Sequence, residues 1–389
     1  MSIPLVLDHL RSRPHAAVPL ADPIPVHELP TPALVLNRPA LQRNIAAMAD
    51  FLGQHGKGFR PHAKTHKCPL ICAEQLAAGA VGVCVAKVGE AAAHAAAGIE
   101  SILITSPVTT PPKAAVVAEL ALTTPDLMIV VDSGAGFDAL AAALDPAAQL
   151  KVLIDLDVSM GRTGTRGLDT VLDLHAQIAE HPGMLFQGVQ HYAGHVMHIE
   201  GYEARRDKSL SLWARLRDDV LTGLAQRGID CTVVTGAGTG TYNIDVDAPE
   251  LTDLQVGSYV FMDEEYRLIG SPTSARFEDF EVSLSVACTT ISQPRDGTIT
   301  VDGGYKAFAS DSVAPVTDDL PDVKFHFAGD EHGVLALGAG QQELGLGQIV
   351  QFVTPHCDPT VNLHDYYWVQ EEDKLIHSCW PITARGASW

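Results

Sequence analysis

The order of apolar and polar positions predicts a long series of buried strands that alternate with helices. Between residues 33 and 263, apolar runs such as "AVGVCVAK" (80–87) and "LMIVVDS" (127–133) recur, and helical patterns such as "LDTVLDLHAQIAEH" follow most of them. Continuously apolar strands linked by helices are typical of a parallel sheet covered on both faces. About eight such units predict a (β/α)₈ barrel of the TIM type, with an open doubly wound sheet as the alternative.

The pattern changes after residue 266. Short strand-like runs separated by turns follow, among them "DGTITVDGG", "VKFHFAG" and "GQIVQFVTPH", with almost no helical spacing. We therefore predict a barrel at 36–265 and a mostly β domain that consists of residues 266–389 together with the N-terminal residues 1–35. Residues 1–30 are proline-rich and are expected to be irregular, and "TPALVLN" (31–37) is expected to be a strand that opens the alternating series.

Composition narrows the functional classes. The 389 residues include 26 basic and 47 acidic side chains, a net charge of −21. Such a chain repels phosphate backbones, so nucleic acid is excluded as an expected partner, and a small polar substrate fits better. The seven cysteines form no C-x-x-C pair, and neither a signal peptide nor a membrane-spanning apolar run is recognised. These features predict reduced thiols, a cytoplasmic location and no membrane partner.

The segment "RPHAKTHKCP" (60–69) is the first concentration of candidate chemistry. It could be a solvated basic loop, a metal site or the seat of a reactive lysine. Chemistry in a barrel lies at the carboxyl ends of the strands, where this segment is expected. Glycine-rich "GAGTGTY" (236–242) follows a late strand, and such loops expose backbone N–H groups that cradle phosphate. A lysine at the first strand with a phosphate loop at the seventh indicates pyridoxal phosphate.

The ordered set of motifs resembles a known family. "TPALVLN", "RPHAKTHK", "DLDVSMGRTG", "HYAGHVMH", "GAGTGTY", "VGSYVFMD", "GDEHG" and "HCDPTVNLHD" span residues 31 to 365. Together they are similar to the D-threonine aldolase and D-serine dehydratase group of alanine-racemase-like (fold type III) pyridoxal-phosphate enzymes. The resemblance implies a barrel that binds the cofactor, a β domain that carries a metal, and a homodimer in which the β domain of one chain covers the barrel mouth of the other.

The resemblance also implies residue roles. The cofactor-binding lysine corresponds to Lys64, with Lys67 expected at the surface or at the start of a helix. A catalytic base corresponds to His198, with His191 and His195 as the other histidines of that motif. The remaining cofactor-binding positions are Arg162, Tyr192, Gly238, Thr239, Gly240, Gln255, Ser258 and Tyr259. Two segments depart from the family pattern. In "CVAKVGEA" (84–91), Ala86 replaces a familiar glutamine and Gly89 a familiar serine, and "SPV" (106–108) replaces a stretch that usually contains asparagine.

The triplet His356-Cys357-Asp358 is the candidate metal site. In an extended segment, residues two apart face the same side, so His356 and Asp358 would share one ion while Cys357 points away. A histidine with a carboxylate suits Mn²⁺, with Mg²⁺ or Zn²⁺ as alternatives. The resemblance implies the same choice, because aldolases of this group carry H-x-D, whereas the dehydratases usually carry H-x-C.

These inferences predict a metal-dependent pyridoxal-phosphate aldolase, a carbon–carbon lyase that cleaves D-3-hydroxy-amino acids to glycine and an aldehyde. A D-serine or 3-hydroxyaspartate dehydratase, giving a 2-oxo acid and ammonia, is the first alternative. A non-catalytic pyridoxal-phosphate carrier would lack the β domain with its H-x-D pair. A racemase would need a second base, and no matching residue is recognised.

Overall fold

The computed structural model describes residues 12–338 and 344–389 and divides the chain into two compact units. The first contains Met48–Gly257 and Gly386–Trp389, and the second contains His15–Ala47 and Ser258–Arg385. Helix α2 (Arg38–Gln54) runs from the second unit into the first. The expectations for residues 1–11, including the lack of a signal peptide there, lie outside the described residues.

An eight-stranded parallel sheet forms the first unit, with the order β3-β10-β9-β8-β7-β6-β5-β4. Its strands are β3 (Gly58–Phe59), β4 (Val83–Val85), β5 (Ser101–Ile104), β6 (Asp126–Val131), β7 (Leu150–Asp155), β8 (Met184–His191), β9 (Val233–Gly236) and β10 (Asp253–Leu254). The end strands β3 and β4 meet at a parallel bridge between His62 and Cys84, where the Cys84 N–H donates to the Pro61 carbonyl at 2.8 Å. The sheet therefore closes on itself, which confirms the predicted barrel and excludes an open sheet.

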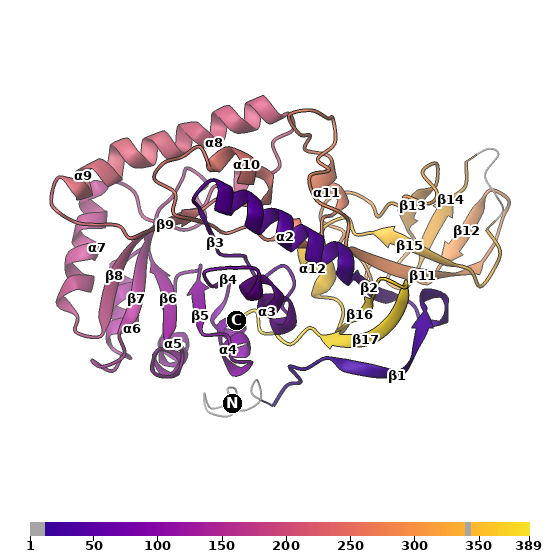
Figure 1. Cartoon of the computed structure of the whole chain (residues 1–389), viewed down its shortest axis with the longest axis horizontal. Helices are drawn as coiled ribbons and strands as arrows, with labels where there is room; N and C mark the ends of the chain where they lie inside the picture. Colours follow the sequence, from indigo (N-terminus) through magenta and orange to yellow (C-terminus); the bar gives the residue numbers. More distant parts are fainter. Residues whose placement is uncertain (1–11, 339–343) are drawn as a thin grey trace. The chain divides into compact units, whose positions relative to one another are not determined.

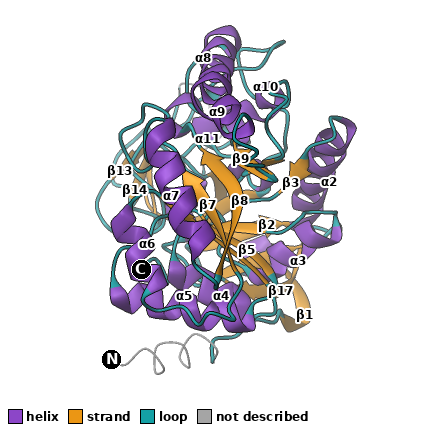
Figure 2. Cartoon of the chain, turned by 90° about the vertical axis from the view of Figure 1, so that its left-hand side faces the viewer, coloured by secondary structure: helices purple, strands orange, loops and turns teal. Residues whose placement is uncertain are grey.

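Helices cover the outer face of this barrel (Figure 2). They are α3 (Pro69–Ala77), α4 (Val88–Ala96), α5 (Pro111–Thr123), α6 (Gly134–Ala141), α7 (Leu168–Glu180), α8 (Tyr202–Leu216), α9 (Thr222–Ala225) and α10 (Tyr242–Asp245), with one-turn 3₁₀ segments η2 (Gly194–Val196) and η4 (Thr239–Thr241). The strands are continuously apolar because both faces are covered, as in β5, where Ile102, Leu103 and Ile104 are all fully buried. Helices α8 and α9 are joined into one long helix by a π-helical turn, η3 (Arg217–Leu221).

A mostly antiparallel sheet forms the second unit, with the order β1-β17-β16-β2-β11-β12-β14-β13 and β15 paired with β11 (Figure 1). Its strands are β1 (Val18–Pro25), β2 (Ala33–Asn37), β11 (Leu284–Ser292), β12 (Thr298–Val301), β13 (Lys324–Phe327), β14 (Gly333–Ala336), β15 (Ile349–Val353), β16 (Tyr366–Gln370) and β17 (Leu375–Pro381). Its short helical segments are η1 (Val26–Glu28), η5 (Ser258–Val260), α11 (Glu264–Arg267) and α12 (Cys357–Val361).

Two expectations for the N-terminal part are wrong. Residues 18–25 form strand β1, which pairs with β17, instead of being irregular. Strand β2 is present as predicted, but it pairs with β11 and β16 and so belongs to this sheet and not to the barrel. An apolar run shows that a strand is buried, but the choice of sheet depends on partners distant in sequence.

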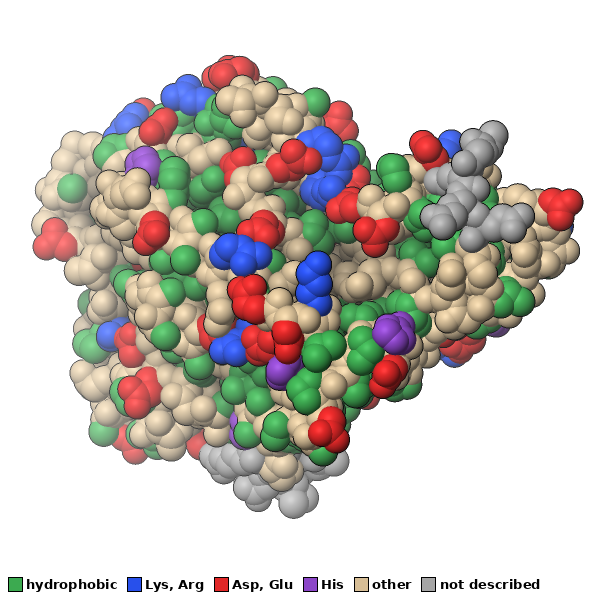
Figure 3. All heavy atoms as spheres, turned by 45° about the vertical axis from the view of Figure 1, so that its right-hand side comes forward, with side chains coloured by type: hydrophobic (Ala, Val, Ile, Leu, Met, Phe, Trp, Pro, Cys, Tyr) green, Lys and Arg blue, Asp and Glu red, His purple; other side chains and the backbone are tan. Residues whose placement is uncertain are grey.

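The surface matches the acidic composition. On the face drawn in Figure 3, acidic and basic side chains are interspersed among apolar and neutral ones. Within the described residues, no helix combines the length and the apolar character that crossing a membrane requires.

Candidate active site

The carboxyl ends of five neighbouring barrel strands bring together most of the predicted cofactor residues. Lys64 follows β3, Gln255 follows β10, and Gly238–Gly240 follow β9, while Tyr192 follows β8 and Arg162 follows β7. The order β3-β10-β9-β8-β7 makes each of these strands a hydrogen-bonded neighbour of the next. Segments that are far apart in sequence therefore meet at one end of the barrel, where the chemistry of such folds is placed.

Lys64 lies on a tight turn between β3 and α3. The N–H of Lys67 donates to the Ala63 carbonyl at 2.7 Å and closes a single turn around Lys64. On one side, the His62 N–H donates to the Val256 carbonyl at 2.8 Å, and on the other, the Ala63 N–H donates to the Cys84 carbonyl at 2.7 Å. The turn is therefore fixed to both neighbouring strand ends, while the Lys64 side chain stays partly accessible.

Lys67 directly precedes Cys68, the N-cap of helix α3, which agrees with the expected position at the start of a helix, but it is buried and does not lie at the surface. Its ammonium is buried, 2.6 Å from a carboxylate oxygen of Glu90, which is also buried. An ammonium enclosed in an ion pair is held in place by its partner, so it is poorly placed to act as a nucleophile. Of the two lysines in the motif, only Lys64 is a partly exposed residue.

Glycines shape the turn after β9. A side chain at Gly236 would clash with the His191 carbonyl, and one at Gly240 would clash with the Met197 carbonyl. At Gly238, a Cβ would lie 2.8 Å from the Met197 sulfur. The backbone thus runs closely past its neighbours into η4, and a glycine-rich turn of this kind can offer its N–H groups to a phosphate.

A second close approach joins the ends of β10 and β3. A Cβ at Gly257 would lie 2.6 Å from the hydroxyl oxygen of Thr65. That hydroxyl is buried and has no hydrogen-bond partner within the described residues. Native proteins rarely leave such a group unpaired, so a bound group at this position has a ready donor. The β9 glycine turn and this hydroxyl both fit a phosphorylated cofactor attached near Lys64.

Gln255 heads a chain of buried polar side chains inside the barrel. Its amide donates to the Gln190 side-chain oxygen at 3.1 Å, and the Gln190 amide donates to the Asp155 carboxylate at 2.8 Å. Burial raises the pKa of Asp155 to about 6, although hydrogen bonds from Gln190 and Thr163 oppose this shift. Sequence reasoning found Gln255 but missed Gln190 and Asp155, whose signal was a polar residue at the end of an apolar strand.

Arg162 and Tyr192 are brought together as expected for two groups of one site. The Arg162 guanidinium carbon lies 5.3 Å from the centre of the Tyr192 ring, a cation–π arrangement. His198 and His195 are exposed on the segment that follows, at and after η2. An exposed histidine near this edge is accessible to a bound small molecule, which is compatible with the role expected of His198.

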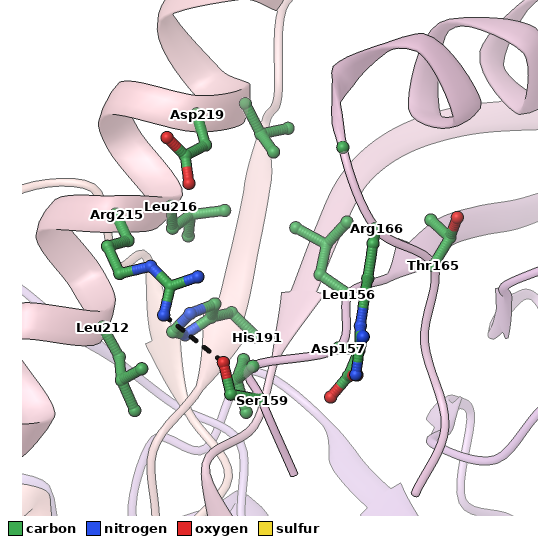
Figure 4. Close-up of a pocket in the computed structure, with 13 residues that line it drawn as sticks. Leu156, Asp157, Ser159, Thr165, Arg166, His191, Leu212, Arg215, Leu216 and Asp219 are labelled. Atoms are coloured by element: carbon green, nitrogen blue, oxygen red, sulfur yellow. Dashed lines mark hydrogen bonds and ion pairs between the residues drawn. The ribbon is translucent and has the colours of Figure 1, made fainter. Parts of the chain in front are cut away.

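His191 is separated from these groups. Its ring is buried against Trp213, with a centroid distance of 4.6 Å, and burial lowers its pKa to about 4. Because Gln190 points into the barrel, the next residue of the strand points out of it. His191 therefore borders a cavity of about 600 Å³ between the β7–α7 loop and α8 (Figure 4). None of the predicted cofactor residues lines that cavity.

Ser258 and Tyr259 lie at the start of the second unit, directly after Gly257. Both are buried, and the Tyr259 ring packs edge-on against Phe280 at 5.6 Å. Their backbone follows the end of β10, the strand beside the β9 glycine turn.

The candidate metal triplet is not extended, so the alternation argument is wrong. Cys357 is the first residue of helix α12, and His356 is its N-cap, with β-type backbone angles. Cys357 is fully buried, its N–H donates to Asp263 at 2.8 Å, and its sulfur lies 3.6 Å from the Asp358 carboxylate. The relative positions of the His356 and Asp358 side chains are therefore set by the N-terminus of helix α12 and not by an extended strand.

Carboxylates surround His356. Its Nδ1 lies 2.8 Å from Asp311 and 3.6 Å from Glu265. Burial alone would lower its pKa, but Asp358, Asp311, Asp263 and Glu265 outweigh that effect and raise the pKa above the ordinary value. Sequence reasoning missed Asp311 and Glu265, because nothing in their local patterns points to residue 356.

The donor set fits a hard or borderline divalent cation held by few protein ligands. Within residues 12–338 and 344–389, no group of three or more His, Cys, Asp and Glu side chains is arranged to hold a metal. A histidine and a carboxylate can still bind an ion such as Mn²⁺ or Mg²⁺ that keeps several water molecules. The buried Cys357 thiol, whose pKa is raised well above the ordinary value by burial, is a poor ligand.

Comparison with known proteins agrees with this arrangement. The family model described as the alanine racemase N-terminal domain matches residues 36–265, and that of a serine dehydratase domain matches residues 283–370. D-threonine aldolase of an Arthrobacter species is 36% identical, over 94% of this chain and 95% of its own. 3-Hydroxy-D-aspartate aldolase of Paracoccus denitrificans is 33% identical, over 93% and 94%.

Solved structures place the chain in the same group. The crystal structure of D-threonine aldolase from Filomicrobium marinum is 34% identical, with a TM-score of 0.90, covering 96% of this chain and all (100%) of that one. D-threo-3-hydroxyaspartate dehydratase from Delftia sp. is 28% identical, with a TM-score of 0.79, covering 92% and 99%. The chain therefore belongs to the alanine racemase-like family, within its D-threonine aldolase and D-serine dehydratase group, and it is a lyase.

Proposed function

We propose that the chain is a pyridoxal-phosphate- and divalent-metal-dependent aldolase that cleaves D-3-hydroxy-amino acids to glycine and an aldehyde. The observation that carries this proposal is the meeting of Lys64, the β9 glycine turn and the Gln255 chain at one end of the barrel. The aldolase relatives, similar over nearly their whole length, support the reaction type.

Lys64 is the residue we assign to cofactor attachment. Lys64 is a partly exposed residue on a turn fixed at both sides, whereas Lys67 is paired with Glu90. The phosphate would meet the backbone of Gly238, Thr239 and Gly240, with Ser258 and Tyr259 following the neighbouring strand. Pyridoxal phosphate, when bound, supplies an electron-withdrawing ring that takes up the electron pair released at the substrate α-carbon.

The Gln255 chain sets the polarity that a bound ring would meet. Gln255 is uncharged and held by Gln190, which is itself held by Asp155. A neutral amide stabilises negative charge on a ring less than a cation does and more than an anion does. We infer an electron sink of intermediate strength, suited to release of a small carbanion such as that of glycine. Arg162, over Tyr192, would face the oxygen-bearing edge of the ring.

Cleavage of the Cα–Cβ bond needs the proton of the β-hydroxyl to leave. We assign the removal of that proton to His198, which accepts it directly or through a water molecule. A divalent cation on His356 and Asp358 would bind the hydroxyl oxygen and lower its pKa. Loss of the proton forms the aldehyde carbonyl, the Cα–Cβ electron pair stays with the α-carbon, and a proton added there completes glycine. D-3-Hydroxyaspartate would give glycine and glyoxylate.

A dehydratase is the competing function, because a dehydratase of the same group is also similar. It would remove the α-proton and expel the β-hydroxyl, giving a 2-oxo acid and ammonia. The residue type at the second proposed metal-ligand position favours the aldolase. Asp358 offers a carboxylate there, while the neighbouring thiol of Cys357 is fully buried.

Product analysis tests the proposal. The protein, stripped with a chelator and reloaded with pyridoxal phosphate, is incubated with D-threonine, D-serine or D-3-hydroxyaspartate, with and without Mn²⁺. We expect glycine and an aldehyde, dependent on the metal. A 2-oxo acid and ammonia as the main products would establish the dehydratase instead, and no turnover of any of the three would support a carrier.

We also infer a homodimer and a cytoplasmic location. The dimer follows from the family resemblance and is checked by sedimentation equilibrium, where a fully active monomer would contradict it. The location is supported by all seven cysteines being free thiols, as expected for a reducing compartment.

A further inference from the structure

The segment Gly386–Trp389 packs on the first unit, against the beginning of helix α4 (Figure 1). The N–H of Gly89 donates to the main-chain oxygen of Trp389 at 3.3 Å. A Cβ at position 89 would clash with the Ala387 carbonyl and lie 2.8 Å from the Trp389 ring. Glycine at this position, where the family resemblance expects serine, therefore makes room for the segment.

The same segment reaches the turn that carries Lys64. The ammonium of Lys67 donates to the Ser388 hydroxyl at 2.9 Å and to one oxygen of Glu90 at 2.6 Å. The other oxygen of Glu90 accepts the N–H groups of Ala86 and Lys87, at 2.8 and 3.2 Å. Glu90 thus ties together the end of β4, the start of α4 and Lys67, and Ser388 supplies the last partner of the ammonium.

Lys67 needs these partners because its backbone is unfavourable. Its φ of 52° lies in the left-handed region, which non-glycine residues rarely adopt and which persists only where the surroundings impose it. Its N–H closes the single turn around Lys64. One isolated turn is not stable by itself. The backbone bonds of His62 and Ala63 fix the beginning of the turn, and the side-chain anchors of Lys67 hold its end.

We propose that Lys67, Glu90 and the 386–389 segment are positioning elements for Lys64, so that docking of the segment sets the affinity for pyridoxal phosphate. This inference rests on the proposed function, because it assigns Lys64 to the cofactor. Nothing in the segment touches the reacting atoms. It acts through Ser388 on Lys67, and through Lys67 on the turn.

Three variants remove the anchor in different ways. Deletion of residues 386–389 takes the segment away, Gly89→Ser blocks its seat, and Ser388→Ala removes one hydrogen bond. Gly53→Ser is the matched control, because Gly53 has an ordinary φ and a Cβ there would meet no atom within 4 Å. Gly89→Ser combined with the deletion separates loss of docking from any direct effect of the new side chain.

Two measurements are made on each protein. Hydrogen exchange of the cofactor-free protein reports the opening of the turn over residues 63–68, and titration with pyridoxal phosphate, followed by absorbance, gives the dissociation constant. We expect the deletion and Gly89→Ser each to speed exchange in the turn and to weaken cofactor binding by at least about tenfold, because they remove the Ser388 hydrogen bond to the ammonium together with the packing of the segment. Ser388→Ala shows a smaller change, Gly53→Ser shows none, and the combined variant equals the deletion.

The two proposals fail in different ways. If the deletion leaves both the turn exchange and the dissociation constant unchanged, the positioning role is wrong, even if the melting temperature falls. If the combined variant is clearly worse than the deletion, the side chain introduced by Gly89→Ser acts directly and the docking explanation is wrong. If the unaltered protein fails to bind pyridoxal phosphate, the proposed function is wrong, whereas the exchange data still test the anchor.

Discussion

The ammonium of Lys67 lies 2.6 Å from the carboxylate of Glu90, and both side chains are buried. Lys64, three residues earlier, is partly exposed. The two lysines of one motif thus have different environments, one inside an ion pair and the other at the end of the barrel. This difference separates a structural role from a chemical one and leads to two predictions.

The first prediction concerns stability. Lys67→Ala leaves the Glu90 carboxylate buried without its cation, and breaking a buried pair in this way costs about 3–5 kcal/mol. We expect a reduction of that order in the free energy of unfolding, measured by chemical denaturation, whereas Lys64→Ala stays close to the parent protein. In the double variant Lys67→Met with Glu90→Gln, neither charge remains, so much of the loss should be recovered. Equal effects of the two single alanine substitutions would contradict the assignment.

The second prediction concerns cofactor attachment. After reduction with borohydride and proteolysis, the pyridoxyl group should be found by mass spectrometry on the peptide that contains Lys64. Lys64→Ala should abolish the labelling, because Lys67 is enclosed by Glu90 and Ser388. Labelling that persists at Lys67 in the Lys64→Ala protein would show that the wrong lysine was chosen.

The third prediction concerns the metal ligands. Asp358→Ala should weaken Mn²⁺ binding, measured by calorimetry, by at least ~10–100-fold. Loss of a residue that only supports a metal ligand already has an effect of this size. The borohydride-dependent labelling of Lys64 should persist, since that residue belongs to the other compact unit. Cys357→Ser is the neighbouring control and should bind Mn²⁺ like the parent, because the thiol is fully buried. The reverse result, with metal lost only in Cys357→Ser, would assign a thiolate site of the dehydratase kind.

The fourth prediction concerns pH. Burial raises the pKa of Asp245 to about 6, although hydrogen bonds from Ser209, Thr241 and Trp213 oppose the shift. A carboxyl with a raised pKa in the folded state binds more protons there than in the unfolded state. Its stabilising contribution is therefore complete below its ordinary pKa of 3.8 and is lost as the pH rises through about 6.

Asp245→Asn removes this dependence. The free energy of unfolding of the variant, relative to the parent, should rise as the pH increases from 4 to about 6 and then level off, with a slope of at most about 1.4 kcal/mol per pH unit. Asp155 and Asp263 titrate in the same window in both proteins, so the difference isolates residue 245. A difference that stays constant with pH would show that the pKa of Asp245 is the same in the folded and unfolded states, so that burial does not raise it.

The sequence by itself determined the barrel and the positions of its strand ends. Apolar runs at regular intervals are buried in any fold that covers both faces of a parallel sheet, so the strands from β3 to β10 were predictable. The family resemblance assigned Lys64, Arg162, Gly238 and Gln255 to the loops that follow those strands. These loops lie at the same end of the barrel because neighbouring strands that run parallel end at the same edge of the sheet.

Only the tertiary structure decided which partners these residues have. The sheet membership of β2, the helical start at Cys357, the pairing of Lys67 with Glu90 and the approach of Asp311 to His356 all depend on contacts between residues that are 20 or more positions apart. Local patterns report the burial of a segment, because burial depends on the segment's own composition. They do not report the partner of a charged or polar side chain, since that partner is supplied by another part of the chain and is fixed only when the chain has folded.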